Sequence, residues 1–173
     1  MCTFKHGYCL KKGGEVRMNF KKIIICLLLV CGVVTIFTGC GKKKEAITKE
    51  QFIEIMEDES FDIVDASDQF SDNKEKINSV TIALNNDYQI EFYEFTSKKI
   101  AKESLKLNRS NFIDNKGISA KESYLLIGNS GKYALTSNDT YYYVSYIDDT
   151  MVYVVTSKEF KDDISKILNE LGY

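Results

Sequence analysis

The feature that most constrains the fold of this chain is a series of β-rich runs separated by short polar turns. Residues 79–84 and 88–95 flank the turn Asn85-Asn86-Asp87, and the runs 124–127, 132–135, 141–147 and 151–155 are separated by the turns 129–131, 137–139 and 148–150. Connections this short join antiparallel neighbours. The sequence therefore predicts a hairpin followed by a four-stranded meander.

Three helices are predicted around these strands. Thr48, with Gln51 three residues later, has capping-box spacing and starts a helix that runs to about residue 57. Ser97 caps a second helix that runs to about residue 112, and Thr156 with Glu159 predicts a third that ends at Gly172. A short strand at 61–65 and a polar stretch at 67–78 with one helical turn complete the series. Strands in runs with helices at the ends and one between indicate a single α+β domain over residues 47–173. We expect an antiparallel sheet with helices packed mainly on one face, including the C-terminal helix.

The residues before this domain have the pattern of an export signal. Lys21 and Lys22 precede an apolar run, 23–37, of about 15 residues that ends in small residues, which is typical of a secretory signal peptide. A transmembrane helix needs about 20 apolar residues, so this run is better explained as a cleaved signal. Met18 begins a complete signal, and we therefore expect residues 1–17 to reflect a mis-assigned start and residues 18–39 to be the signal peptide.

The end of that run, Phe37-Thr38-Gly39-Cys40, resembles the lipobox of bacterial lipoproteins, although the family usually has Leu where this chain has Phe37. The resemblance implies that Cys40 receives lipid chains such as palmitate and becomes the new N-terminus after cleavage, with residues 40–46 as lipidated anchor and spacer. It also implies attachment through Cys40 to membrane lipid on the extracytoplasmic face of a bacterial cell membrane. The remaining chain resembles small surface lipoproteins of Gram-positive bacteria, a likeness that carries no activity with it.

Composition restricts the chemistry of the expected mature chain. From Gly41 onward there are 17 basic and 24 acidic residues, a net charge of −7, which argues against a nucleic-acid partner. The only histidine, His6, precedes Cys40, as do the four other cysteines, Cys2, Cys9, Cys26 and Cys31. Nucleophilic triads that use histidine, thiol redox chemistry and zinc or copper sites with His or Cys ligands are thereby excluded. We expect no cofactor.

Tyrosines and aspartates supply the candidate sites. Strand alternation places Tyr141 and Tyr143 on one face of their strand, and with Tyr153 on the next strand they are predicted as a binding face. Strand propensity and cross-strand packing would also account for these tyrosines. Four aspartates, Asp62, Asp65, Asp68 and Asp72, could supply oxygen ligands for calcium, but they lack EF-hand spacing and equally suit a solvated loop. No metal site is predicted.

These observations favour a non-enzymatic, lipid-anchored binding or interaction module with a surface protein or cell-wall partner. The alternative is a carboxylate-based hydrolase that acts on cell-wall material, because two carboxylates can perform acid and base catalysis without histidine. Alternation predicts that Glu91 and Glu94 lie on opposite faces of their strand and so do not form such a pair.

Overall fold

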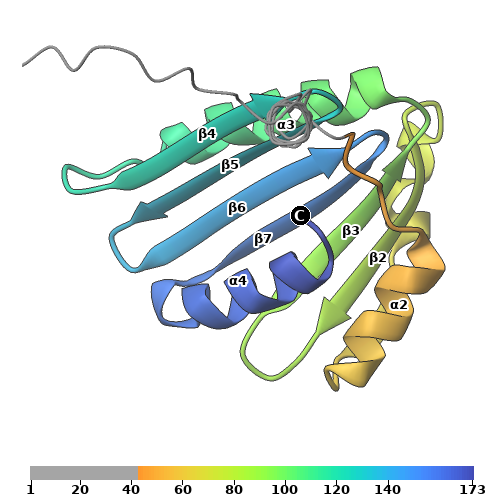
Figure 1. Cartoon of the computed structure of the whole chain (residues 1–173), viewed down its shortest axis with the longest axis horizontal. Coiled ribbons are helices and arrows are strands. Elements are labelled where there is room, and N and C mark those ends of the chain that lie inside the picture. The colour runs from red at the N-terminus through yellow and green to blue at the C-terminus, as the bar shows by residue number, and fades with distance from the viewer. Residues whose placement is uncertain (1–42) are drawn as a thin grey trace, which may run out of the picture. The chain divides into compact units, whose positions relative to one another are not determined.

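A computed structural model describes residues 43–173, which belong to the compact unit Gly41–Tyr173. The unit contains one seven-stranded antiparallel sheet with strand order β1-β2-β3-β7-β6-β5-β4 (Figure 1). The strands are β1 Asp62–Asp65, β2 Ile77–Leu84, β3 Gln89–Phe95, β4 Lys121–Ile127, β5 Ser130–Ser137, β6 Thr140–Ile147 and β7 Thr150–Ser157. The helices are α2 Lys49–Asp58, α3 Lys98–Ile113 and α4 Lys161–Glu170, with 3₁₀ segments η1 Ser67–Asn73 and η2 Lys158–Phe160. The predicted α+β class and antiparallel sheet are confirmed.

Local capping signals position the first two helices as predicted. The Thr48 side chain accepts from the Gln51 N–H, and the Gln51 side chain accepts from the Thr48 N–H, so the capping box that starts α2 is complete. Ser97 accepts from the Ile100 N–H and caps α3. Both helices begin within a residue of the predicted positions because their first N–H groups find side-chain partners in the local sequence.

The last helix starts later than predicted. Thr156 does not cap it, because this residue lies in β7 and pairs with Tyr141 of β6. The strand continues to Ser157, a 3₁₀ turn follows, and α4 begins at Lys161 without a side-chain cap. Ladder pairing with β6 therefore outcompetes the capping-box spacing. Helix α4 ends at Glu170, and Gly172, with a φ of 81°, follows the C-cap residue Leu171 at the predicted end of the helix.

The sheet is made from two antiparallel segments joined at one seam. Asn85 accepts from the N–H groups of Asp87 and Tyr88 and closes the β2–β3 hairpin. Strands β4 to β7 form the predicted meander. Strand β3 then pairs with β7, with Glu91 opposite Tyr153 and Glu94 opposite Thr150, so the two segments become one sheet.

Helices cover both faces of this sheet, in contrast to the expectation that they pack mainly on one face. Helices α2 and α4 pack on one face, called here the α4 face, whereas α3, the longest helix within residues 43–173, packs against β5 and β6 on the opposite side, the α3 face (Figure 1). The physical reason lies in the strands, since β6 places Tyr143 and Ile147 on the α4 face and Val144 and Tyr146 on the α3 face, all of them buried. A strand that is apolar on both sides needs cover on both sides.

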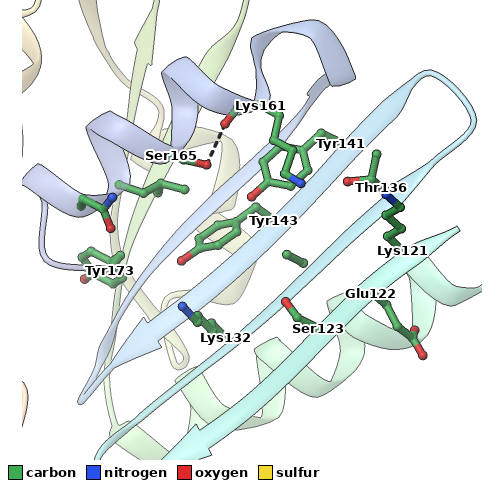
Figure 2. A pocket seen from close by; sticks show the side chains of 13 residues that line it. Lys121, Glu122, Ser123, Lys132, Thr136, Tyr141, Tyr143, Lys161, Ser165 and Tyr173 are labelled. Carbon is green, nitrogen blue, oxygen red and sulfur yellow. Dashed lines mark hydrogen bonds between the residues drawn. The ribbon is translucent and has the colours of Figure 1, made fainter.

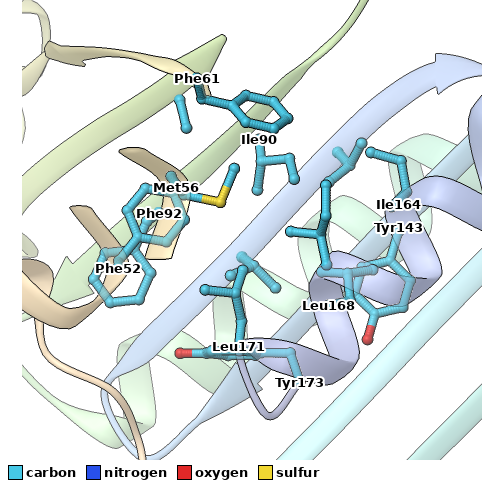
Figure 3. Close-up of a cluster of buried hydrophobic side chains, with 14 of the residues drawn as sticks. Phe52, Met56, Phe61, Ile90, Phe92, Tyr143, Ile164, Leu168, Leu171 and Tyr173 are labelled. Carbon is cyan, nitrogen blue, oxygen red and sulfur yellow. The ribbon is translucent and has the colours of Figure 1, made fainter. Parts of the chain in front are cut away.

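The core of the α4 face holds α2 and α4 against the sheet (Figure 3). Phe52 of α2 stacks on Phe92 of β3 with ring centroids 4.9 Å apart. Ile164 and Leu168 of α4 are buried beside Val152 of β7. Helix α4 is therefore anchored over the middle of the sheet, and its position determines how much of this face stays uncovered.

No helix among residues 43–173 is long and apolar enough to cross a membrane. The predicted start at residues 1–17, the signal peptide at 18–39 and the lipidation site Cys40 lie outside the described residues.

Candidate functional site

A groove of about 280 Å³ lies on the α4 face between α4 and the open end of the sheet (Figure 2). Three strands form its floor, and α4 with the C-terminal residue forms one wall. The lining residues are Lys121, Glu122, Ser123, Lys132, Ala134, Thr136, Tyr141, Tyr143, Lys161, Ser165, Leu168, Asn169 and Tyr173. The groove exists because α4 covers the β7 side of this face and packs over Tyr141 and Tyr143 of β6, whereas no helix of residues 43–173 covers β4 and β5 on this face (Figure 1).

Two of the three predicted binding tyrosines line this groove. Tyr141 and Tyr143 project side by side from β6 with ring centroids 6.2 Å apart (Figure 2). Their exposed fractions are only 4% and 6%, because α4 packs over them. Burial, with a smaller contribution from Tyr143, raises the pKa of Tyr141 to about 12, and burial also raises the pKa of Tyr143. These rings are packing residues at the base of the groove and offer a partner little surface.

The third tyrosine lies elsewhere. Tyr153 of β7 is on the α3 face, where its ring lies 5.6 Å from that of Phe112. It lines a separate hollow of about 410 Å³ that also includes Phe70, Leu107 and Met151. The structure therefore does not bring Tyr153 together with Tyr141 and Tyr143. Tyr153 and Tyr143 lie on opposite faces of the sheet because cross-strand partners share a face. Tyr143 is paired with Val154, whereas Tyr153 is paired with Val144.

The accessible chemistry of the groove comes instead from lysines at its rim. Lys121 of β4, Lys132 of β5 and Lys161 of α4 are all exposed, and none of them forms an ion pair with another described residue. The Lys161 ammonium lies 5.7 Å from the centroid of the Tyr141 ring. For Lys132, the sequence pattern indicates the face of the strand on which it lies. Lys132, Ala134 and Thr136 alternate along β5 with the buried Tyr133 and Leu135.

A fourth lysine lies near one end of the groove and belongs to the segment before α2. The Lys44 backbone and the Asn129 side chain exchange two hydrogen bonds, of 3.1 Å and 2.8 Å, and the Lys44 ammonium donates to the Gly172 carbonyl at 2.9 Å. Partial burial, followed by the charge of nearby Lys132, lowers the pKa of Lys44. Like charges therefore crowd at this end of the groove. The predicted spacer is attached to the domain from residue 44 onward.

Acidic groups contribute little to the groove itself. Glu122 is the one acidic residue among its lining residues, and its side chain points away from the groove (Figure 2). Its carboxylate accepts from the Tyr133 hydroxyl at 2.9 Å and pairs with Lys116 at 3.0 Å. Hydrogen bonds from Lys116 and Tyr133 lower the pKa of this carboxyl. Glu91 and Glu94 lie on opposite faces of β3, as predicted.

The aspartates of the acidic loop do not converge. Asp65 accepts from Lys49 at 2.7 Å and from the Ser67 N–H at 2.9 Å, and these partners hold its pKa well below the usual range. No group of three or more His, Cys, Asp or Glu residues within 43–173 is arranged to hold a metal ion. The Asp65 carboxylate therefore has a structural role, because it pairs with Lys49 at the start of α2.

Comparison of the chain with protein-family models, with curated proteins and with solved structures finds no match.

Proposed function

We propose that this chain is a lipid-anchored, extracytoplasmic binding module that holds its partner in the groove between α4 and strands β4 to β6. The single observation that carries the proposal is the groove itself, an open hollow lined by accessible polar side chains from two strands and a helix. Rigid elements that present convergent polar groups around a concave surface are typical of ligand sites. The anchor rests on the lipobox resemblance at Cys40.

The groove chemistry supports binding over hydrolysis. Acid and base catalysis by carboxylates needs two such groups on either side of the reacting bond, within roughly 5–10 Å of each other. The groove has one acidic lining residue, Glu122, and its carboxylate is engaged by Tyr133 and Lys116 on the other side of β4. We therefore place binding before the hydrolase alternative.

Site-specific photo-cross-linking on intact cells tests this proposal. A photoreactive amino acid replaces Ser123, an exposed groove residue, in the full-length chain, and a matched variant carries it at Leu107, which is 64% exposed on α3. We expect a discrete cross-linked product from position 123 and none of that mass from position 107. Equal products from both positions, or none from position 123, would contradict a groove-bound partner.

The anchor is tested in the same cells. Mass spectrometry of the mature N-terminus is expected to find a diacylated Cys40, and Cys40→Ser is expected to release the protein from the membrane fraction. An unmodified Cys40 in a membrane-bound protein would contradict the anchoring proposal.

A further inference from the structure

The groove concentrates positive charge in a domain that is otherwise acidic. The chain from Gly41 onward carries a net charge of −7, yet the groove is surrounded by three lysines that pair with no carboxylate of residues 43–173, and Lys44 lies beside Lys132. Lysines on acidic proteins commonly pair with a neighbouring carboxylate, as Lys98 and Lys158 do here at 2.6 Å and 2.5 Å. The groove lysines instead share one hollow with hydroxyl groups of Ser123 and Thr136. This arrangement favours an anionic ligand.

The cations of the groove are lysines, which bind phosphate as compact point charges. Arginine is the cation that recognises carboxylates and phosphates by paired hydrogen bonds. None of the described residues that line the groove is an arginine. The one arginine of residues 43–173, Arg109, lies over the Tyr124 ring at 4.7 Å, beyond the opposite side of β4.

The lysines are arranged at two ends of the groove. Lys121 is the cross-strand partner of Thr136, which in turn pairs with Tyr141, so Lys121 and the Lys161 ammonium above Tyr141 mark one end. Lys132 lies four residues from Thr136 along β5, about 13 Å at a rise of about 3.3 Å per residue. Lys44 lies beside it. A single phosphate is shorter than this span, so one ligand that engages both ends carries at least two anionic groups.

The buried tyrosines argue against a nucleic acid. Proteins that hold single strands stack successive bases on exposed aromatic rings. The aromatic rings of this groove, Tyr141, Tyr143 and Tyr173, are between 4% and 6% exposed and leave no platform for a base. The accessible groups are ammonium, hydroxyl and amide donors, which suit a phosphate-linked polyol.

We propose that the groove binds a linear phosphodiester polymer of the polyol-phosphate type, with different phosphates of one chain held by the Lys121–Lys161 end and the Lys132–Lys44 end. This inference rests on the proposed binding function and names the ligand class of that site. The proposed extracytoplasmic location of the domain is compatible with such a ligand at the cell surface. Lys44 is the fourth residue after Cys40, so the backbone of Lys44 lies within about 14 Å of the proposed lipid attachment.

Binding of labelled poly(glycerol phosphate) to the full-length protein in neutral phosphatidylcholine vesicles tests the inference. In a flotation assay the polymer is expected to co-migrate with the vesicles. Its affinity for the protein is expected to fall as salt is added, because binding releases counterions from the polymer. In the variant Lys121→Gln/Lys132→Gln the affinity falls on the order of tenfold, and the slope of log affinity against log salt decreases by roughly 0.7 for each phosphate that the variant no longer neutralises. The matched control is Lys102→Gln/Lys106→Gln, which makes the same change of net charge on the exposed surface of α3 and is expected to leave binding unchanged.

Each result decides the inference. Polymer binding that the groove variant weakens and the control variant does not supports it. Equal loss in both variants would show that net charge alone governs binding, and equal affinity for oligothymidine would show that the phosphate polymer is not distinguished from nucleic acid. Binding only to vesicles that contain phosphatidylglycerol would assign the lysines to lipid head groups and overturn the linear polymer. If the polymer fails to bind while the position-123 cross-link persists on cells, the ligand class is wrong and the binding function stands.

Discussion

The C-terminal residue is predicted to contribute several kcal/mol to the stability of the domain. Tyr173 is 5% exposed, and its ring packs in the same core as Ile164 and Leu171 (Figure 3). Its hydroxyl contacts the Thr150 hydroxyl inside the protein. Removal of a buried aromatic ring usually costs about 3–5 kcal/mol, so Tyr173→Ala should lower the free energy of unfolding by that amount. For a domain of this size the melting temperature would fall by roughly 10–20 °C.

The hydroxyl alone should matter much less than the ring. Tyr173→Phe keeps the packing, and the Thr150 hydroxyl still donates to the Ile147 carbonyl at 2.9 Å, so no buried donor is left without a partner. We expect a loss of about 1 kcal/mol. Urea unfolding of the full-length chain in neutral detergent, followed by circular dichroism, measures both variants, with Leu107→Ala on the surface of α3 as the control. A Tyr173→Ala variant within about 0.5 kcal/mol of the control would refute the reasoning, because it would mean that the chain end frays as termini often do.

Three further predictions concern charge and close packing. Burial raises the pKa of Tyr141 from about 10 to about 12. The contribution of its neutral hydroxyl to folding stability is therefore complete below pH 10 and is lost as the pH rises through 12. Tyrosinate absorbance at pH 11 should be lower in the folded protein than in urea. Asp148 pairs with Lys98 at 2.6 Å, and this pair holds the pKa of the Asp148 carboxyl below its usual value. Asp148→Asn should lower the free energy of unfolding by about 0.5–1 kcal/mol at neutral pH and by progressively less as the pH falls below about 4. An equal loss in acid would contradict the ion pair. A Cβ at Gly131 would lie 2.7 Å from Cε1 of the buried Tyr146, so Gly131→Ala should destabilise by about 1–3 kcal/mol in the same urea assay, whereas an unchanged midpoint would show that the ring can move.

The groove changes which residues carry the functional hypothesis. The sequence directed attention to Tyr141 and Tyr143 because aromatic residues are conspicuous in a strand. In the structure their rings support α4, and the accessible cations Lys121, Lys132 and Lys161 surround the opening. Each lysine is unremarkable in its own segment, since exposed lysines occur throughout the chain. They form a candidate site only because the fold brings them to one groove, and this depends on where α4 crosses the sheet.

Local sequence determined the secondary structure of this protein. The capping box at Thr48, the serine cap at Ser97 and the Asn85 turn involve residues within a few positions of one another, and each element occurs where its signal predicts. The exception is Thr156, whose capping spacing yields to a cross-strand pair with Tyr141, fifteen residues earlier in the chain. A local signal is dependable only where no long-range pairing competes for the same backbone groups.

Tertiary structure alone decided the seam between β3 and β7, the placement of α3 opposite α2 and α4, and the assembly of the groove. These features bring together residues far apart in sequence, and they are chosen by the burial of both apolar faces of the central strands. Strand alternation showed that Tyr142 and Tyr143 face opposite sides of β6, but it contained no information on which helix covers each side. The physical reason is that periodicity describes one element at a time, whereas a binding groove is a relation among several.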